Sequence, residues 1–242
     1  MTAEAPSSFA EFVEQVATNR RTIAVYAPER QAALEAYFGS RNVTVEHESL
    51  PNDGSGGFVV VTAEGEFVGS ASVRAVRELL SPSDRVLETG SSTPIRLPMN
   101  LLAETTFVSF DRRQLLAASR EFEDRAYREG EGALRVGFQS LSKSSAQRKV
   151  YEAFIDGTDL DVHVYGVPDW SPELPGVTVH AIDATEIGTF WFVVFDGGDD
   201  PEQACALLAE EMPDDPDSFR GFWTYDPETV AALDAYLRET YE

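Results

Sequence analysis

Apolar blocks recur in the same order in the two halves of the chain. The first half carries them at 23–29, 43–50, 58–61 and 106–111, and the second half carries counterparts at 162–169, 177–184, 192–195 and 221–226. The step from the second block to the third is 15 residues in both halves, from Val43 to Phe58 and from Val177 to Phe192. Shared order and equal spacing predict a degenerate tandem duplication.

Within each copy, the pattern predicts helices that alternate with short strands. The first copy opens with a helix that Ser8 caps, with Glu11 completing a capping box. The second copy opens with an amphipathic helix over 147–155. The third block of each copy is apolar on both faces, which predicts a central strand in a covered sheet. Turn residues follow at 63–66 and 196–198 and predict hairpins.

The remaining segments are less regular. Asp111 and Asp226 end the last strand of each copy and are placed to cap the next helix. Residues 205–209 are expected to form a returning strand, with a helix starting at Asp200 as the alternative. Residues 82–100 are rich in Ser, Pro and Gly and predict a loop. Residues 134–138 predict a strand in the segment that joins the copies.

These elements predict an α/β (mixed α+β) fold made of two degenerate repeats of a helix-flanked mixed β-sheet unit. We expect a first repeat over 8–128, a connecting segment over 129–146 and a second repeat over 147–242. The length of 242 residues fits one large domain or two small ones.

The charge balance is strongly acidic. The net charge is −23, from 42 acidic against 19 basic residues, and the only lysines are Lys143 and Lys149. The acidic residues are spread along the chain, which favours a cytosol containing multimolar salt over a basic partner. At about 1 M salt the Debye length is ~3 Å, so dense carboxylates hardly repel one another. In that setting, acidity argues only mildly against nucleic acid.

Composition also limits the chemistry. Cys205 is the single cysteine, so no internal disulfide and no thiolate zinc site is expected. No apolar run approaches the ~20 residues that span a bilayer, and the N-terminus lacks the pattern of a signal peptide, so we expect a cytoplasmic protein. Ser140 and Lys143 fit S-x-x-K, but the companion motifs are absent and a loop is expected. We expect no catalysis, and no cofactor can be named.

The strand predicted over 161–165 carries a histidine. Alternation places Asp161, His163 and Tyr165 on one face, where they could line a pocket or simply pack under a helix. A metal site of His163, His180 and a carboxylate is an alternative. The ligand spacing is not recognisable, so no metal is assigned.

A charge-dense helix segment covers 120–125. Pairs such as Arg120 with Asp124 are spaced i,i+4, which favours a solvated, self-paired face. The alternative is that Arg120 binds an anion or the carboxylate of a partner.

Several short motifs resemble one known family. The chain is similar to the DICT sensory domains, which occur attached to diguanylate cyclases, phosphodiesterases and two-component proteins, and as single-domain forms in halophilic archaea. The motifs span 105–228 and are Ser119–Asp124, Gly137–Gln139, Tyr151, Val164–Tyr165, Pro168–Asp169, Phe190–Val194, Leu207–Leu208, Glu210 and Gly221–Asp226. The resemblance implies a sensory or signal-transducing module. No catalytic output domain or phosphoacceptor domain is recognisable here.

The leading hypothesis is a cytoplasmic sensory module that binds a small ligand or a regulatory protein, without nucleic acid or membrane contact. The expected ligand-binding residues are Arg120, Glu123, Phe138, Gln139, His163, Tyr165, Trp191 and Trp223. Arg120 would meet an anionic group, Gln139 and His163 would form hydrogen bonds, and the aromatic rings would stack. One alternative is a transcription-linked regulator that acts by protein contact. Another is a hydrolase-like enzyme that uses His163 with Asp161 or Asp169. The assembly is open, with a homodimer as one option.

Overall fold

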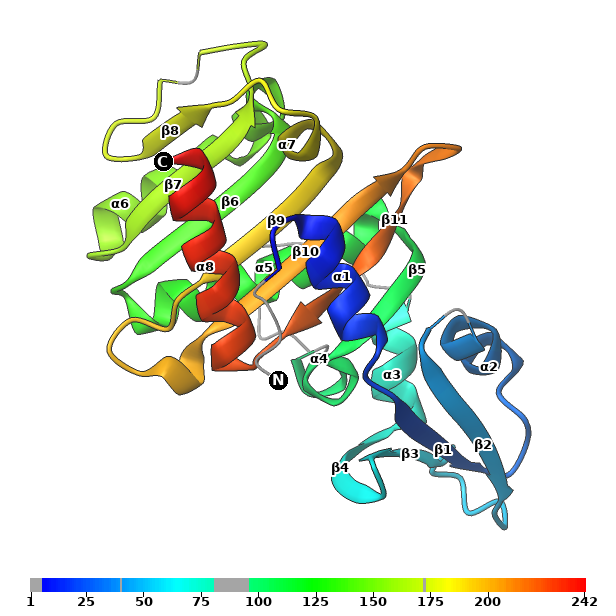
Figure 1. Ribbon diagram of the computed structural model, residues 1–242. Helices are drawn as coiled ribbons and strands as arrows, with labels where there is room; N and C mark the ends of the chain where they lie inside the picture. The colour runs from blue at the N-terminus through cyan, green and yellow to red at the C-terminus, as the bar shows by residue number, and fades with distance from the viewer. Residues whose placement is uncertain (1–5, 40, 81–95, 172) are drawn as a thin grey trace, which may run out of the picture.

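The computed structural model describes residues 6–39, 41–80, 96–171 and 173–242 (Figure 1). The first part of the chain forms α1 (Phe9–Ala17), β1 (Arg21–Ala27), α2 (Ala32–Gly39), β2 (Val43–Ser49), β3 (Phe58–Ala63), β4 (Glu66–Ser72), α3 (Val73–Leu80), α4 (Arg96–Leu102), β5 (Thr105–Asp111) and α5 (Arg112–Glu129). The second part forms β6 (Ala133–Ser140), the 3-10 helix η2 (Leu141–Gln147), α6 (Arg148–Gly157), β7 (Asp161–Val167), β8 (Thr178–Ala181), α7 (Thr185–Thr189), β9 (Phe190–Phe195), the 3-10 turn η3 (Pro201–Gln203), β10 (Cys205–Met212), β11 (Asp215–Thr224) and α8 (Pro227–Tyr241).

The strands form two mixed sheets, which confirms the mixed α/β class. The smaller sheet has four strands in the order β2-β1-β3-β4, and the larger has seven in the order β5-β11-β10-β9-β6-β7-β8. In the small sheet β1 runs parallel to β2 and antiparallel to β3. In the large sheet β7 is parallel to β8 and β6, and β6 is antiparallel to β9.

The order β2-β1-β3-β4 reappears in the large sheet as β8-β7-β9-β10, with β6 inserted between β7 and β9. The last strands of the two predicted copies, β5 and β11, pair with each other. The segment 129–146, expected to join the copies, therefore supplies an inner strand of the large sheet. The predicted strand at 134–138 is confirmed as part of β6.

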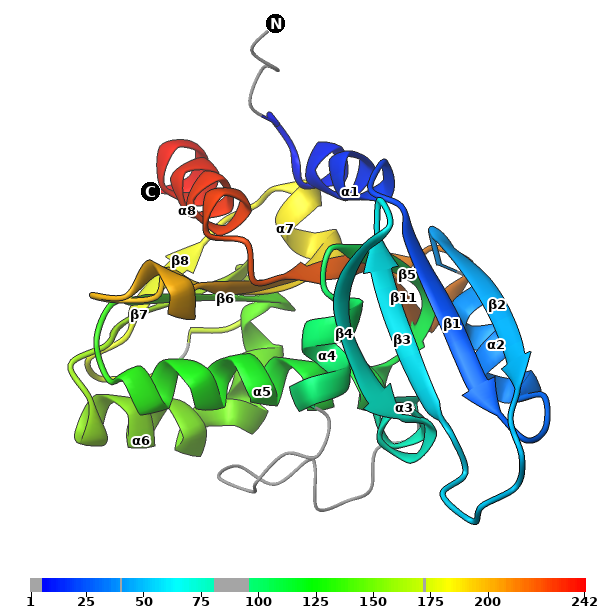
Figure 2. The ribbon, with the colours of Figure 1, turned by 90° about the horizontal axis from the view of Figure 1, so that it is seen from below.

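Helices cover both faces of the large sheet (Figure 2). α1, α7 and α8 lie on one face, and α5 and α6 lie on the other. Side chains alternate along the strands, so each face has its own core. Val193 and Phe195 of β9 belong to the core under α5, whereas Phe192 and Val194 belong to the core under α1 and α8.

The predicted caps are confirmed, but Glu11 does not complete a capping box with Ser8, because its carboxylate accepts the backbone N–H of Ser7 instead. Ser8 accepts the N–H of Glu11, and Asp226 accepts the N–H of Thr229 with Pro227 in the first turn. Asp111 and Gln114 form a reciprocal capping box at the start of α5. These caps satisfy N–H groups that have no partner inside their own helix.

The structure corrects two of the expected elements and decides between two alternatives for a third. A loop was expected over 82–100, but residues 96–102 form helix α4. The side chains of Met99, Leu101 and Leu102 are buried, which stabilises this helix. The rest of the expected loop, up to residue 95, lies outside the described residues. The strand β3 is not covered on both faces, since Phe58 is 42% exposed. The segment 205–209 is the expected returning strand, and η3 with its Asp200 cap is a single turn before it.

Within the described ranges, each helix is too short or too polar to traverse a lipid bilayer.

Candidate functional site

The large sheet separates the eight predicted site residues by face. Phe138 of β6 and Trp191 of β9 pack into the core under α5 and α6, on the side of Arg120 and Glu123. Tyr165 packs into the opposite core under α8, and His163 alternates with the inward Val162 and Val164 of the other face. The structure therefore does not gather the eight residues into a single pocket.

A pocket of about 360 Å³ opens beside Phe138 and Trp191. Its lining consists of Arg112, Leu116, Phe138, Ser142, Lys143, Ser145, Ala146, Gln147 and Trp191. The two aromatic rings lie 6.4 Å apart between centroids and, with Leu116, form an apolar wall. Hydroxyl groups of η2 and two cationic side chains provide the polar part. Ligand sites commonly combine an apolar wall with a few polar groups.

Lys143 and Arg112 bring positive charge to this pocket. The Lys143 ammonium donates a hydrogen bond of 2.6 Å to Gln139 Oε1 and lies 4.0 Å from Glu211 Oε2. Arg112 lies 3.8 Å from the other oxygen of Glu211. Burial lowers the pKa of Lys143 below its usual range, and the charge of Arg112 adds to this effect while Glu211 opposes it. Gln139, which makes the hydrogen bond to Lys143, lies at the end of β6 and has a left-handed backbone conformation with φ 66°.

A buried polar network lies behind the pocket. Arg120 contacts the carboxylate of Glu123 and the side-chain oxygen of Gln147, which also lines the pocket. Tyr151 donates a hydrogen bond of 2.9 Å to Glu123 Oε1. Burial raises the pKa of Glu123, although Arg120 and Tyr151 partly offset the shift. Burial beside Glu123 also raises the pKa of Tyr151.

The charge-dense segment of α5 is therefore largely buried, and the prediction of a solvated, self-paired face is wrong. Arg120 and Glu123 are 6% and 3% exposed, and Glu121 and Arg125 are also buried. The i,i+4 spacing suggested surface pairs, but α5 packs across the middle of the large sheet and carries these residues inward. Buried charges need hydrogen-bonded partners, which the Arg120–Glu123 pair supplies.

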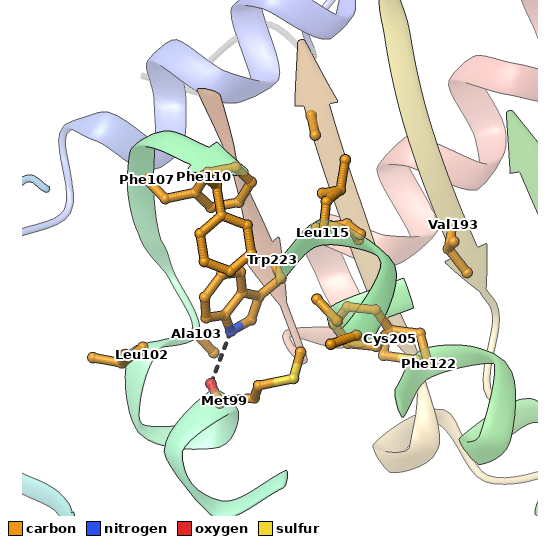
Figure 3. Packing of buried hydrophobic residues seen from close by; sticks show 14 of the residues in the cluster. Met99, Leu102, Ala103, Phe107, Phe110, Leu115, Phe122, Val193, Cys205 and Trp223 are labelled. Carbon is orange, nitrogen blue, oxygen red and sulfur yellow. Dashed lines mark hydrogen bonds between the residues drawn. The ribbon is translucent and has the colours of Figure 1, made fainter. Parts of the chain in front are cut away.

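Trp223 lies apart from the pocket, where Arg41, just before β2 of the small sheet, meets β11 of the large one. Figure 3 shows Trp223 among Phe107, Phe110 and Met99. Its indole N–H donates a hydrogen bond of 2.8 Å to the Met99 carbonyl oxygen. The ring packs against Phe107 and Phe110 at 5.5 and 5.7 Å, and the Arg41 guanidinium lies 4.7 Å from its centroid. These contacts make Trp223 a buried junction residue.

On the opposite face, two imidazoles and a carboxylate meet. His163 Nδ1 lies 2.9 Å from His180 Nε2 and 3.3 Å from Glu242 Oε1. Tyr165 donates a hydrogen bond of 2.5 Å to the same Glu242 oxygen. Burial lowers the pKa of His180, and the neighbouring His163 adds to the shift. Burial raises the pKa of Glu242, but Tyr165 and Arg135 together outweigh it and keep that pKa below its ordinary value.

Two acidic residues had been considered as partners of His163. Asp161 Oδ2 lies 3.1 Å from His163 Nε2. Asp169 instead accepts a 2.9 Å hydrogen bond from the backbone N–H of Ser142. Of the two hydrolase-like pairings, the structure therefore brings together His163 and Asp161.

Sequence reasoning missed Arg112, Lys143 and Gln147 as pocket residues, and Glu242 as a neighbour of His163. One signal was present for Lys143, since it is one of only two lysines in a chain of net charge −23. The others depend on how η2 and α8 fold back onto the sheet, which local sequence does not specify.

Residues 96–212 match the model of the DICT family, described as a sensory domain in diguanylate cyclases and two-component systems. The match covers just under half of the chain and runs from α4 to the end of β10. It includes the pocket and both histidines of β7 and β8, but not Trp223 or Glu242.

The chain shows little similarity to whole proteins. No curated protein matches the chain. Among solved structures, the chain is similar to a crystal structure of polyphosphate kinase from Porphyromonas gingivalis, at 12% identity and a TM-score of 0.37. The alignment covers 96% of this chain and 48% of that one, so the chain spans about half the length of the kinase. A likeness of this size carries no inference about activity.

Proposed function

We propose that this protein is a non-catalytic sensory module whose pocket at Phe138 and Trp191 binds a small molecule with a flat apolar body and one anionic group. The observation that carries the proposal is the pocket itself, because an aromatic wall faces two cationic side chains in a strongly acidic chain. The DICT match supports a sensory role.

The lining favours an anion over a cation. Among the nine lining residues two are cationic and none is acidic, although acidic residues outnumber basic ones 42 to 19 in the chain. A volume of about 360 Å³ is near the lower end of ligand pockets, which suits a small molecule of two or three rings. A carboxylate or a phosphate ester would meet both cations and the hydroxyls of η2.

The same contacts offer a route for a signal. An anion that takes the Lys143 ammonium would compete with Gln139 and Glu211, which join the ends of β6 and β10. A ligand that displaces the side chain of Gln147 would reach Arg120 and, through it, Glu123 and Tyr151. The first change would alter the link between β6 and β10, and the second would pass from the pocket to α5 and α6. We place this module in the cytoplasm of a halophile, because the spread of acidic residues suits molar salt.

One alternative function rests on a separate observation. The uncovered face of the small sheet carries Tyr26 and Phe58, whose rings stack at 5.0 Å, and Phe67, which is 68% exposed. Exposed aromatic groups of this kind favour protein contact. A regulator that acts through a bound protein would use this face rather than the pocket.

Native mass spectrometry and an absorption spectrum of protein purified in multimolar KCl test the proposal first. A co-purifying small anion would identify the ligand class directly. Binding of the anionic dye anilinonaphthalenesulfonate (ANS) then tests the pocket itself. Ala146→Trp places an indole at the pocket lining and should weaken ANS binding at least about tenfold, because the ring enters the space that the dye would occupy.

Ala153→Trp is the matched control, since Ala153 is exposed on α6 and does not line the pocket. It should leave ANS binding unchanged. Equal binding by wild type, Ala146→Trp and Ala153→Trp would contradict the proposed site. Recovery of a regulatory protein that is lost on Phe67→Ala, with ANS binding intact, would favour the protein-contact alternative.

A further inference from the structure

Three possible metal ligands converge on the face of the large sheet opposite the pocket. His163 comes from β7, His180 from the edge strand β8, and Glu242 follows the end of α8. One donor atom from each lies within 4.8 Å of the other two, and two of these separations are 2.9 and 3.3 Å. Ligands of a tetrahedral metal at bond lengths of about 2.0–2.1 Å are separated by roughly 3.3 Å. The His163–Glu242 separation already has this value, and a small outward movement of His180 would bring its separation from His163 to it as well.

The neighbouring side chains hold these groups in place. Asp161 faces the far nitrogen of His163 at 3.1 Å, which leaves Nδ1 directed at His180 and Glu242. Tyr165 holds the carboxylate of Glu242 at 2.5 Å, and its ring stacks on His180 at 4.3 Å. A carboxylate behind a ligating imidazole and a hydrogen bond to a ligating carboxylate are the usual support of metal ligands.

The charges around the three groups also suit a cation. Arg135 lies 3.2 Å from Glu242, but it is paired at 3.1 Å with Asp234 as well. Two carboxylates, of Asp234 and Glu242, thus contact this guanidinium, and a third, of Asp161, lies against His163. The carbonyl end of α8 points toward this region and carries partial negative charge.

We propose that His163 Nδ1, His180 Nε2 and the Glu242 carboxylate bind one divalent transition-metal ion, with Zn²⁺ as the best-suited ion. Two imidazoles and one carboxylate are a common donor set for this class, whereas Mg²⁺ and Ca²⁺ prefer oxygen ligands alone. The fourth position is left for water. Such an ion would tie the edge strand β8 and the end of α8 to β7.

Binding requires no change in the charge of either imidazole. In the hydrogen-bonded pair one proton lies between His163 Nδ1 and His180 Nε2. When the metal takes both lone pairs, the shared proton moves to the outer nitrogen of the imidazole that carries it, which is Nε2 of His163 or Nδ1 of His180. The site lies on the opposite face from the pocket, so it adds to the proposed sensory function and does not depend on it.

The test is titration of the purified protein with Zn²⁺ and Co²⁺ in molar KCl with excess Mg²⁺, which occupies acidic surface sites. We expect one equivalent of Co²⁺ to produce the visible absorption of a low-symmetry imidazole site. His180→Gln and Glu242→Gln should each weaken binding at least about tenfold. His47→Gln is the matched control, because His47 lies in β2 of the small sheet.

Imidazole resonances give a readout without substitution, since the chain has only three histidines. Zn²⁺ should shift the resonances of His163 and His180 and leave those of His47 in place. Absence of the visible absorption, equal binding by wild type and His180→Gln, or a shift confined to His47 would each overturn the proposal. ANS binding by the His180→Gln variant should be unchanged, which separates failure here from failure of the pocket.

Discussion

The small sheet and the matching strands of the large sheet share an order but differ in what covers them. Tyr26 and Phe58 stack at 5.0 Å on the small sheet, where Phe58 is 42% exposed. Their counterparts in the apolar blocks are Tyr165 and Phe192, which lie 5.6 Å apart and are fully buried. In the large sheet, α1 places the ring of Phe9 5.2 Å from Phe192.

Strand β6 lies between the two strands that carry Tyr165 and Phe192. Gly137 of β6 pairs with Tyr165 on one side and with Phe192 on the other. The ring of Phe192 lies over Gly137, so close that a Cβ there would be 2.1 Å from it. The two rings contact each other across β6 because a residue without a side chain separates their strands. The large sheet has an additional inner strand, two covered faces and the pocket, whereas the small sheet has one open face.

The largest expected effect comes from truncating the two equivalent phenylalanines. Phe192→Ala should lower the free energy of unfolding by about 3–5 kcal/mol, because it removes a fully buried ring. Phe58→Ala should cost less than about 1 kcal/mol, because much of its ring is already in water. Urea unfolding at fixed KCl measures both. Similar losses for the two variants would mean that the small sheet is covered in solution.

A second, smaller effect is expected at Gly137. Gly137→Ala should destabilise the protein by about 1–3 kcal/mol, since the new methyl group collides with the Phe192 ring. Adding Phe192→Leu should recover part of that loss, as a double-mutant cycle would show. Gly39→Ala is the control, because a Cβ at Gly39 meets nothing within 4 Å. A Gly137→Ala protein as stable as wild type would contradict the packing described for β6.

Much of the fold could be predicted from the sequence where the signal is local. The apolar runs predicted β1, β7 and β9, and Asp111 and Asp226 were identified as caps. Sheet membership is a non-local property, so the pairing of β5 with β11 and the insertion of β6 did not follow from pattern. The same limit misjudged β3, whose apolar sequence matches β9 but which has only one covered face.

The candidate site was predictable only in part. Alternation along 161–165 correctly separated His163 and Tyr165 from Val162 and Val164. Aromatic character did not separate Trp191, which lines the pocket, from Trp223, which joins the sheets. Lys143 was interpreted as a loop residue. Apart from Gln139 of β6, its neighbours at the pocket come from α5 and β10, which are distant in sequence.

The smallest expected effect bears on the central claim, that the pocket of the large sheet binds an anion. Lys143→Gln and Lys149→Gln change the net charge equally, but only Lys143 lines the pocket. ANS binding should weaken about threefold to tenfold in Lys143→Gln, because one charged contact is lost. Phenylnaphthylamine, the neutral analogue, should bind all three proteins within about twofold of one another.

The pH profile of ANS binding to wild type, Lys143→Gln and Lys149→Gln is the most direct measurement. Lys143 is charged below its pKa, and burial lowers that pKa from the ordinary 10.5. Wild type and Lys149→Gln should therefore lose ANS affinity as the pH rises, beginning below 10.5, whereas Lys143→Gln should show a flat profile in that range. Identical profiles for the two lysine variants would contradict an anion-binding pocket at Phe138 and Trp191.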